Sequence, residues 1–196
     1  MRIIAGSAKG RKLLSPEGTA ARPTSDRARE ALFSSLESEY GDIRGIRFLD
    51  LFSGSGAVSA EALSRGAKSI VAVESDRTAL AIARSNIEMV AALTEAEEAT
   101  VVDSDVSDYA LRTSNPFDVI FLDPPYTYPD QEIVRLLERL HESGFMVSQT
   151  LVVIERASRS DAFPWPERMR QVKERRYGNA AIFYGEINSD LEAEKG

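Results

Sequence analysis

Four consecutive residues, Asp123, Pro124, Pro125 and Tyr126, have the types and the order needed to handle a planar amine. They follow the apolar run 119–122, which is typical of a buried strand. Each proline fixes φ and lacks an N–H, so the chain stays extended and its carbonyls remain available as acceptors. A carboxylate and a carbonyl can accept the protons of an –NH2 group while the tyrosine ring stacks on its face. The same pattern also fits a proline-rich strand–helix turn with a packed tyrosine.

Glycines and acidic residues upstream indicate a second site. Gly54 and Gly56 let the backbone turn sharply and approach a ligand closely before a helix begins. Glu74 comes eighteen residues after Gly56, about where an acidic side chain takes up ribose hydroxyls. Asp105, next to Val106, is placed to accept a hydrogen bond from an adenine amino group. Together these residues predict a site for a nucleoside cofactor.

The surroundings of the glycines favour one cofactor over others. A dinucleotide fingerprint needs Gly or Ala where Ser59 stands, and Asp50 before the turn would repel phosphates. The Asp50 carboxylate would suit an amino-acid ammonium instead. No Gly-Lys-Ser/Thr follows the glycines, and Ser55 lacks the preceding glycine of a nucleophile elbow. S-adenosylmethionine (SAM) therefore fits better than NAD or a nucleoside triphosphate.

Hydrophobic periodicity predicts the elements that must position these residues. The chain alternates predicted strands with predicted helices, which is the pattern of an α/β fold built from right-handed βαβ units. An open parallel sheet binds its ligands beyond the carboxyl ends of its strands, where both candidate sites fall. We expect strands at 46–51, 69–74, 100–102, 119–122 and 151–154, helices after Thr24 or Ser25 and at 57–65, 77–90 and 131–141, and a closing antiparallel pair at 170–177 and 180–184.

Composition excludes several classes of chemistry. The chain has no cysteine and one histidine, His141 in a predicted polar helix, so disulfides, thiolate nucleophiles, His-based triads and multi-His metal sites drop out. It shows no signal-peptide pattern and no apolar run near 18 residues. We therefore expect a soluble, cytoplasmic protein that uses no metal and contacts no membrane.

Charge is segregated along the chain. The net charge is −7, yet residues 1–30 and 156–176 each carry a net +4, which leaves −15 for the remainder. Two basic segments on an acidic body are typical of a localised phosphate-binding face, although solvated surface charge gives the same pattern.

The ordered motifs resemble those of class I SAM-dependent amino-methyltransferases. Three further segments, 2–13, 22–33 and 177–179, narrow the resemblance to bacterial methyltransferases that modify guanine N(2) in small-subunit (16S) ribosomal RNA. It covers nearly all of residues 1–187. It implies a Rossmann-like, mainly parallel seven-stranded sheet with a C-terminal antiparallel hairpin and an N-terminal β-hairpin extension. The expected organisation is a basic hairpin extension at 1–20, a SAM-dependent methyltransferase domain at 21–187 and a polar, disordered tail at 188–196.

The resemblance also implies roles for individual residues. Catalysis is expected from Asp123, Pro124 and Tyr126. SAM is expected to contact Arg27, Asp50, Phe52, Ser53, Gly54, Gly56, Glu74, Ser75, Asp105, Val106 and Asp123. RNA contacts are expected from Lys9, Arg11, Lys12, Arg22, Arg175, Arg176, Tyr177 and Asn179.

The expected partner is 16S rRNA, within the small ribosomal subunit or an assembly intermediate, and the expected state is a monomer. A DNA adenine amino-methyltransferase shares the Asp-Pro-Pro-Tyr motif and remains an alternative. A module that binds SAM and RNA without catalysis is another.

Overall fold

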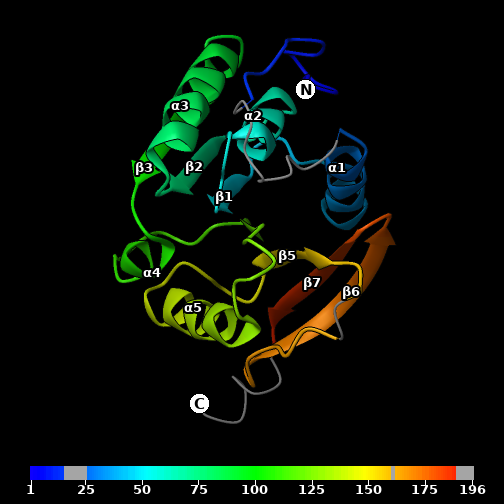
Figure 1. Ribbon diagram of the computed structural model, residues 1–196, viewed down its shortest axis with the longest axis vertical. Helices are drawn as coiled ribbons and strands as arrows, with labels where there is room; N and C mark the ends of the chain where they lie inside the picture. Colours follow the sequence, from blue (N-terminus) through cyan, green and yellow to red (C-terminus); the bar gives the residue numbers. More distant parts are fainter. Residues whose placement is uncertain (16–25, 160–161, 189–196) are drawn as a thin grey trace. The chain divides into compact units, whose positions relative to one another are not determined.

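The structure, a computed structural model, describes residues 1–15, 26–159 and 162–188 (Figure 1). It divides into two compact units, Met1–Asp105 and Val106–Gly196. The predicted boundary at residue 20 and nearly all of the predicted tail fall outside the described residues.

In its described residues, 1–15 and 26–105, the first unit contains three parallel strands and three helices. The strands are β1 (Arg47–Leu51), β2 (Ser69–Glu74) and β3 (Glu98–Asp103), in the spatial order β3-β2-β1. Asp50 stands opposite Ala72, which stands opposite Val101 in the next strand. β1 and β2 are almost wholly buried, as expected of strands in a parallel sheet that is covered on both faces. Their carboxyl ends therefore lie at one edge, where Asp50 and Glu74 are found.

The helices of this unit are α1 (Asp26–Tyr40), α2 (Ala57–Ser64) and α3 (Arg77–Ala91). All eight residues of α2 are buried, and α2 packs beside α3 (Figure 1). α3 is amphipathic, and its N-cap Asp76 accepts a hydrogen bond from the Ala79 N–H. Because α2 is buried on every side, it is held firmly and can position the backbone at both of its ends.

Residues 1–15, here called the basic N-terminal segment, dock on the C-terminal end of α2. The segment doubles back through one isolated antiparallel bridge between Arg2 and Lys12, so the predicted β-hairpin is reduced to a single bridge without paired strands. The Ser7 N–H donates to the Ser64 carbonyl at 2.7 Å, and the Ser64 hydroxyl donates to the Ala5 carbonyl at 2.5 Å. These contacts with α2 supplement the backbone hydrogen bonds between the two arms of the segment, in which the Ile3 N–H donates to the Arg11 carbonyl at 2.9 Å and the Leu13 N–H to the Met1 carbonyl at 3.1 Å.

The close approach in this docking requires a glycine. A Cβ on Gly6 would lie 1.7 Å from the Ser64 carbonyl oxygen, and the residue has a φ of +80°. Only glycine fits that backbone conformation and that gap.

A buried charged cluster underlies the same docking. Glu61 in α2 is fully buried and accepts the backbone N–H groups of Ile4 and Ala5 at 2.9 and 3.0 Å. Its carboxylate also pairs with Arg65 Nε at 2.9 Å and with the buried Arg29 Nε at 3.5 Å. Buried charges are stabilised by pairing, and the Glu61 carboxylate pairs with both arginines and accepts hydrogen bonds from the basic N-terminal segment, although Arg29 Nε and Nη1 make no hydrogen bond to any described residue.

The described part of the second unit, residues 106–159 and 162–188, contains four strands and two helices. Its elements are α4 (Val106–Tyr109), β4 (Val119–Leu122), α5 (Asp130–Glu142), β5 (Leu151–Ala157), β6 (Met169–Tyr177) and β7 (Ala180–Ile187). The spatial order is β4-β5-β7-β6; β4 and β5 are parallel, and β7 pairs antiparallel with both β5 and β6. The closing antiparallel pair is therefore confirmed.

The predicted elements agree with the structure apart from local differences. The predicted inward face of α5, Ile133, Leu136, Leu137 and Leu140, is buried. In α1, Ala28, Leu32 and Leu36 are buried, whereas Ala31 is only half-buried. The short helix α4 was not predicted, because four residues give too little periodicity to detect. β5 runs three residues beyond its predicted end at Ile154, because its pairing with β7 continues through Glu155, Arg156 and Ala157.

Candidate functional site

The turn between β1 and α2, residues 52–56 and here called the glycine turn, departs from ordinary backbone conformation. Phe52 has a φ of 65°, and it is the one described non-glycine residue with a positive φ. Gly56, the N-cap of α2, has a φ of 70°, and a Cβ there would lie 3.0 Å from Ile87 Cδ1 and 3.1 Å from Ala83 Cα. Strained backbone of this kind persists where the surroundings impose it, and it concentrates at ligand sites.

Asp50 holds the first turn of α2. It is buried, with 1% of its surface exposed, and its Oδ2 accepts both the Ser59 hydroxyl at 2.6 Å and the Ser59 N–H at 3.2 Å. A carboxylate at the N-terminus of a helix is favoured by the helix dipole. Asp50 therefore orients the helix that follows the glycine turn, a role that the sequence did not indicate.

Glu74, at the end of β2, is half-buried and held by three backbone N–H groups. Oε2 accepts from Gly54 at 2.7 Å, while Oε1 accepts from Ser75 at 2.8 Å and from Asp76 at 2.7 Å. The hydrogen bond with Gly54 ties the end of β2 to the glycine turn. Oε1 already accepts two hydrogen bonds and Oε2 accepts one, so Oε2 of this preoriented carboxylate can accept one more, as from a ribose hydroxyl.

The glycine turn offers a ligand an unsatisfied polar group and an open backbone. The Ser53 hydroxyl is buried and makes no hydrogen bond to any described residue, so it is a polar group that a ligand can satisfy. A Cβ on Gly54 would meet open space rather than neighbouring atoms. Together with the Glu74 carboxylate, these features fit the polar groups of a nucleoside cofactor.

Asn86 is a site-supporting residue that the sequence analysis missed. It lies in α3, is 1% exposed, and its Nδ2 donates to the Ser55 carbonyl of the glycine turn at 2.9 Å. The same amide pairs with the backbone of Leu14. The sequence does contain a sign of this role, because Asn86 is a polar residue between Ala83 and Val90 on the otherwise apolar face of a predicted helix.

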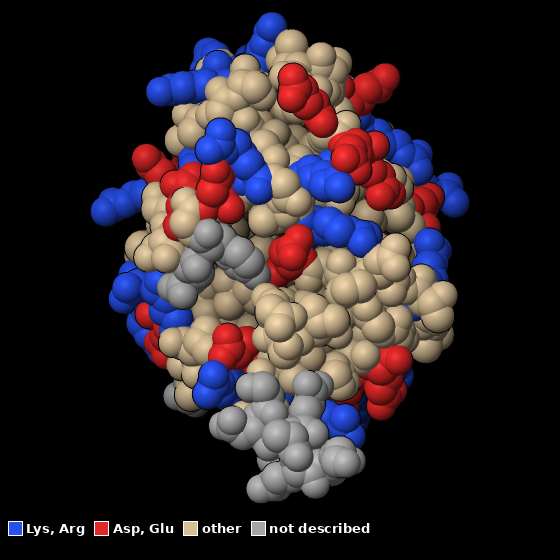
Figure 2. All heavy atoms as spheres, turned by 180° about the vertical axis from the view of Figure 1, so that it is seen from behind, with Lys and Arg blue, Asp and Glu red and all other residues tan. Residues whose placement is uncertain are grey.

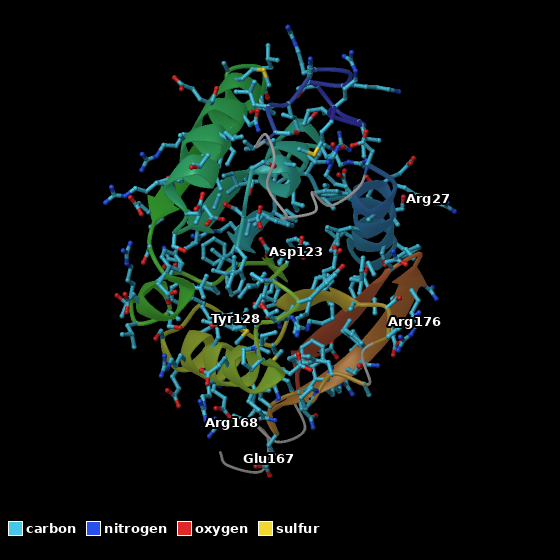
Figure 3. The ribbon with its side chains drawn as sticks, in the orientation of Figure 1. Arg27, Asp123, Tyr128, Glu167, Arg168 and Arg176 are labelled. Atoms are coloured by element: carbon cyan, nitrogen blue, oxygen red, sulfur yellow. The ribbon has the colours of Figure 1, made fainter. Side chains whose placement is uncertain are left out.

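The other predicted cofactor residues of the first unit are accessible. Arg27 is exposed in the first turn of α1 (Figure 3). Ser75 and Asp105 are exposed just beyond the carboxyl ends of β2 and β3. Val106, which begins the second unit, is buried in the first turn of α4.

The Asp-Pro-Pro-Tyr turn follows β4 in the second unit, as predicted. Asp123 is half-buried, Pro124 is buried, and Tyr126 is 49% exposed. The Pro125 carbonyl accepts the Tyr128 N–H at 2.8 Å, which closes the loop that continues into α5 (Figure 3 labels Asp123 and Tyr128). The turn thus carries a half-buried carboxylate and, three residues further on, an exposed aromatic ring, the two groups that a planar amine would need.

The predicted RNA-contacting residues of the basic N-terminal segment point outward. Lys9, Arg11 and Lys12 are exposed, while Ile3, Ala8 and Leu13 are buried beneath them. In Figure 2, basic side chains project at the top, the end where Figure 1 places this segment. The segment is therefore amphipathic, with one face packed on the protein and a cationic face toward solvent. Arg22 lies outside the described residues.

The predicted RNA-contacting residues near the C-terminus differ in exposure and in their existing partners. Arg175 and Asn179 are exposed, and Tyr177 is half-buried. Arg176, at the end of β6 (Figure 3), pairs with Glu174 at 2.7 Å and donates to the Ser158 carbonyl. A phosphate would therefore have to compete with Glu174 for Arg176, which makes Arg175 the more accessible cation of the two.

Comparison with known proteins places these features in a family. The family model described as "Conserved hypothetical protein 95" matches residues 1–186. The chain is 36% identical to "Ribosomal RNA small subunit methyltransferase D" of Escherichia coli K12 over 156 residues, which are 79% of this chain and 74% of that protein. It is 34% identical to the protein of the same name from Haemophilus influenzae over 182 residues, which are 91% of this chain and 89% of that protein.

A solved structure shows the same fold. "Putative methyltransferase yhhF" from Escherichia coli superposes with a TM-score of 0.79 at 31% identity, covering 96% of this chain and 98% of that chain. The predicted Rossmann-like methyltransferase fold is thereby confirmed. Among the described residues, no helix has the length and apolarity needed to cross a membrane.

Proposed function

Since the chain belongs to the conserved hypothetical protein 95 family, with ribosomal RNA small subunit methyltransferase D among its relatives, we propose that it methylates a guanine of 16S rRNA. The methyl group passes from SAM to the exocyclic amine N(2). The observation that carries this proposal is the Asp-Pro-Pro-Tyr turn at the end of β4, which has a half-buried carboxylate and an exposed aromatic ring.

Residues between Arg27 and Val106 bind the cofactor in this proposal. Glu74 accepts the ribose hydroxyls, Asp105 and Val106 contact the adenine, and the glycine turn with Phe52, Ser53 and Ser75 encloses the nucleoside. Arg27 pairs with the carboxylate of the methionine part. Asp50 contributes through its hold on Ser59 and by favouring a nearby ammonium.

The second unit prepares the amine. A guanine amino nitrogen is a poor nucleophile, because its lone pair is delocalised into the ring. Hydrogen bonds from its two protons to Asp123 and to the Pro124 carbonyl favour a pyramidal nitrogen, while Tyr126 stacks on the base. Bound SAM supplies an activated methyl group on its sulfonium. The chain's own contribution is therefore positioning and electrostatic preorganisation.

The basic segments hold the RNA under this proposal. Lys9, Arg11 and Lys12 form one cationic face, and Arg175, Arg176, Tyr177 and Asn179 form another. Arg22 is a further proposed RNA contact that lies outside the described residues. We place the reaction in the cytoplasm, on 16S rRNA within a small ribosomal subunit or an assembly intermediate, with the protein acting as a monomer.

The test offers SAM labelled on its methyl group with three acceptors: free 16S rRNA, small ribosomal subunits that lack the modification, and duplex DNA. The methylated nucleoside is then identified by mass spectrometry. N(2)-methylguanine from either RNA acceptor is the expected product. Methyladenine in DNA would identify the alternative enzyme, and transfer to no acceptor would leave a binding module.

Two variants sharpen this test. Asp123→Ala should lower methyl transfer about a hundredfold or more, as for loss of one transition-state hydrogen bond, with RNA affinity nearly unchanged. Glu138→Ala removes an exposed carboxylate of α5 in the same unit and should transfer at the wild-type rate. Equal activity of the two variants would refute the role of Asp123.

A further inference from the structure

Arg156 of β5 contacts the loop that begins with the Asp-Pro-Pro-Tyr turn. Its Nη1 donates to the Pro125 carbonyl at 3.3 Å, and its Nη2 donates to the Tyr128 carbonyl at 2.8 Å. Nη2 also lies 2.9 Å from Asp130 Oδ1, an ion pair with the first residue of α5. The Arg156 side chain is only 7% exposed. One buried guanidinium thus holds two carbonyls of the loop and the first residue of the helix that follows it.

The prolines explain why this loop needs an external anchor. The register of β4 with β5 ends at the pair Leu122 and Ile154, although β5 continues to Ala157. Pro124 and Pro125 have no N–H, so they cannot donate to a continuing ladder. The extension of β5 instead carries Arg156, two residues past the last pair, and its planar fork of donors takes up the loop carbonyls.

The anchor itself is firmly placed. β5 lies between β4 and β7, and Arg156 stands opposite Ala181 in the antiparallel ladder with β7. Its backbone is therefore held within the sheet while its head group reaches the loop. Burial strengthens the hydrogen bonds of the guanidinium, because little water competes for them.

We propose that Arg156 is a positioning residue for methyl transfer, which fixes the Asp-Pro-Pro-Tyr turn so that Asp123 and the Pro124 carbonyl face the amine. The inference rests on the proposed function. Arg156 itself touches neither base nor cofactor. A displacement of about 1 Å at the reacting groups can lower a rate by about a hundredfold.

The test compares Arg156→Met and Arg156→Lys with Arg135→Met, which removes an exposed arginine of α5 that pairs with Glu132. Single-turnover methyl transfer, KM for the RNA acceptor, SAM affinity and the thermal midpoint are measured on each full-length variant. We expect the transfer rate to fall about a hundredfold in Arg156→Met and about tenfold in Arg156→Lys. KM and SAM affinity should change by less than about threefold, since only positioning is impaired.

Asp130→Asn separates positioning of the turn from stabilisation of α5. It weakens the ion pair but keeps both carbonyl hydrogen bonds, so its transfer rate should stay within about threefold of wild type. A rate as low as that of Arg156→Met would overturn the proposal, because the ion pair alone would then matter.

A wild-type rate in Arg156→Lys would also overturn it, and that variant keeps the test decisive if Arg156→Met does not fold. Failure of the wild-type protein to methylate any acceptor would instead refute the proposed function.

Discussion

The side-chain amide of Asn86 and the backbone of Leu14 hydrogen-bond to each other in both directions. The Leu14 N–H donates to Asn86 Oδ1 at 2.8 Å, and Asn86 Nδ2 donates to the Leu14 carbonyl at 3.0 Å. Because Nδ2 also donates to Ser55, one buried amide joins the basic N-terminal segment to the glycine turn. Both donors and the acceptor of this side chain are satisfied.

Replacing Asn86 with alanine should therefore affect stability and cofactor binding together. The change leaves polar backbone groups of Leu14 and Ser55 without their partner, which costs about 2–4 kcal/mol of unfolding free energy. Urea denaturation measures that decrease, and calorimetry should show weaker SAM binding. Asn115→Ala, at an exposed asparagine, should change stability by less than about 0.5 kcal/mol. Equal stability of the two variants would contradict the role given to Asn86.

Glu61→Gln tests the anchor of the basic N-terminal segment. The substitution removes the buried carboxylate that Arg29 and Arg65 share, which leaves each arginine only an exposed partner. Removing one partner of a buried pair typically costs about 3–5 kcal/mol. Hydrogen exchange at the Ile4 and Ala5 amides should accelerate, because both donate to Glu61.

Glu37→Gln is the matched control for Glu61→Gln. It removes the exposed partner of Arg65, and a surface ion pair contributes only about 0–1 kcal/mol. If the Ile4 and Ala5 amides exchange equally fast in both variants, Glu61 does not anchor the segment.

Gly56→Ala should weaken SAM binding through steric crowding. Its Cβ would press on Ala83 and Ile87 of α3, at a positive φ that L-residues disfavour. Gly10→Ala is the control, because Gly10 also has a positive φ (+83°) but its Cβ would meet open space. The control should be destabilised by about 1–2 kcal/mol from backbone strain alone, with normal SAM affinity. A larger destabilisation together with reduced SAM affinity is expected only at Gly56.

Neutralising the cationic face of the basic N-terminal segment should change the salt dependence of RNA binding. The triple variant replaces Lys9, Arg11 and Lys12 with glutamine. In a plot of the logarithm of the RNA-binding constant against the logarithm of the salt concentration, its slope should become shallower by roughly 0.7 for each phosphate that the variant no longer binds. Filter binding over a range of salt concentrations measures the slope. SAM affinity should be unaffected. An unchanged slope would remove this segment from the RNA interface.

The strands of the sheet were the most predictable part of this protein. The strands at 69–74 and 119–122 are found with the predicted bounds. Continuous apolar runs of this length, rich in β-branched residues, are typical of strands that are buried on both faces of a parallel sheet. The Asp-Pro-Pro-Tyr turn was predictable for a related reason, since prolines act on the backbone locally.

The polar supports of the site could not be predicted, because their partners are distant in sequence. Asn86 binds Leu14 across 72 positions, and Glu61 binds Ile4 across 57. The sequence pattern shows that such a residue is a polar side chain on the apolar face of a helix. It does not show which distant residue will be the hydrogen-bond partner, because that partner comes close only in the folded protein. Arg156 was counted with a basic segment, whereas β5 extends far enough to bury it.

Helix α2 also constrains how this chain can vary in length. Its eight residues span about 12 Å, with the glycine turn at one end and the Ser64 carbonyl that receives the basic N-terminal segment at the other. One inserted or deleted residue would rotate one end against the other by about 100° and shift it by about 1.5 Å. Since every side of α2 is packed, neither change can be absorbed, so insertions and deletions should be excluded from residues 54–64 even where substitutions are accepted.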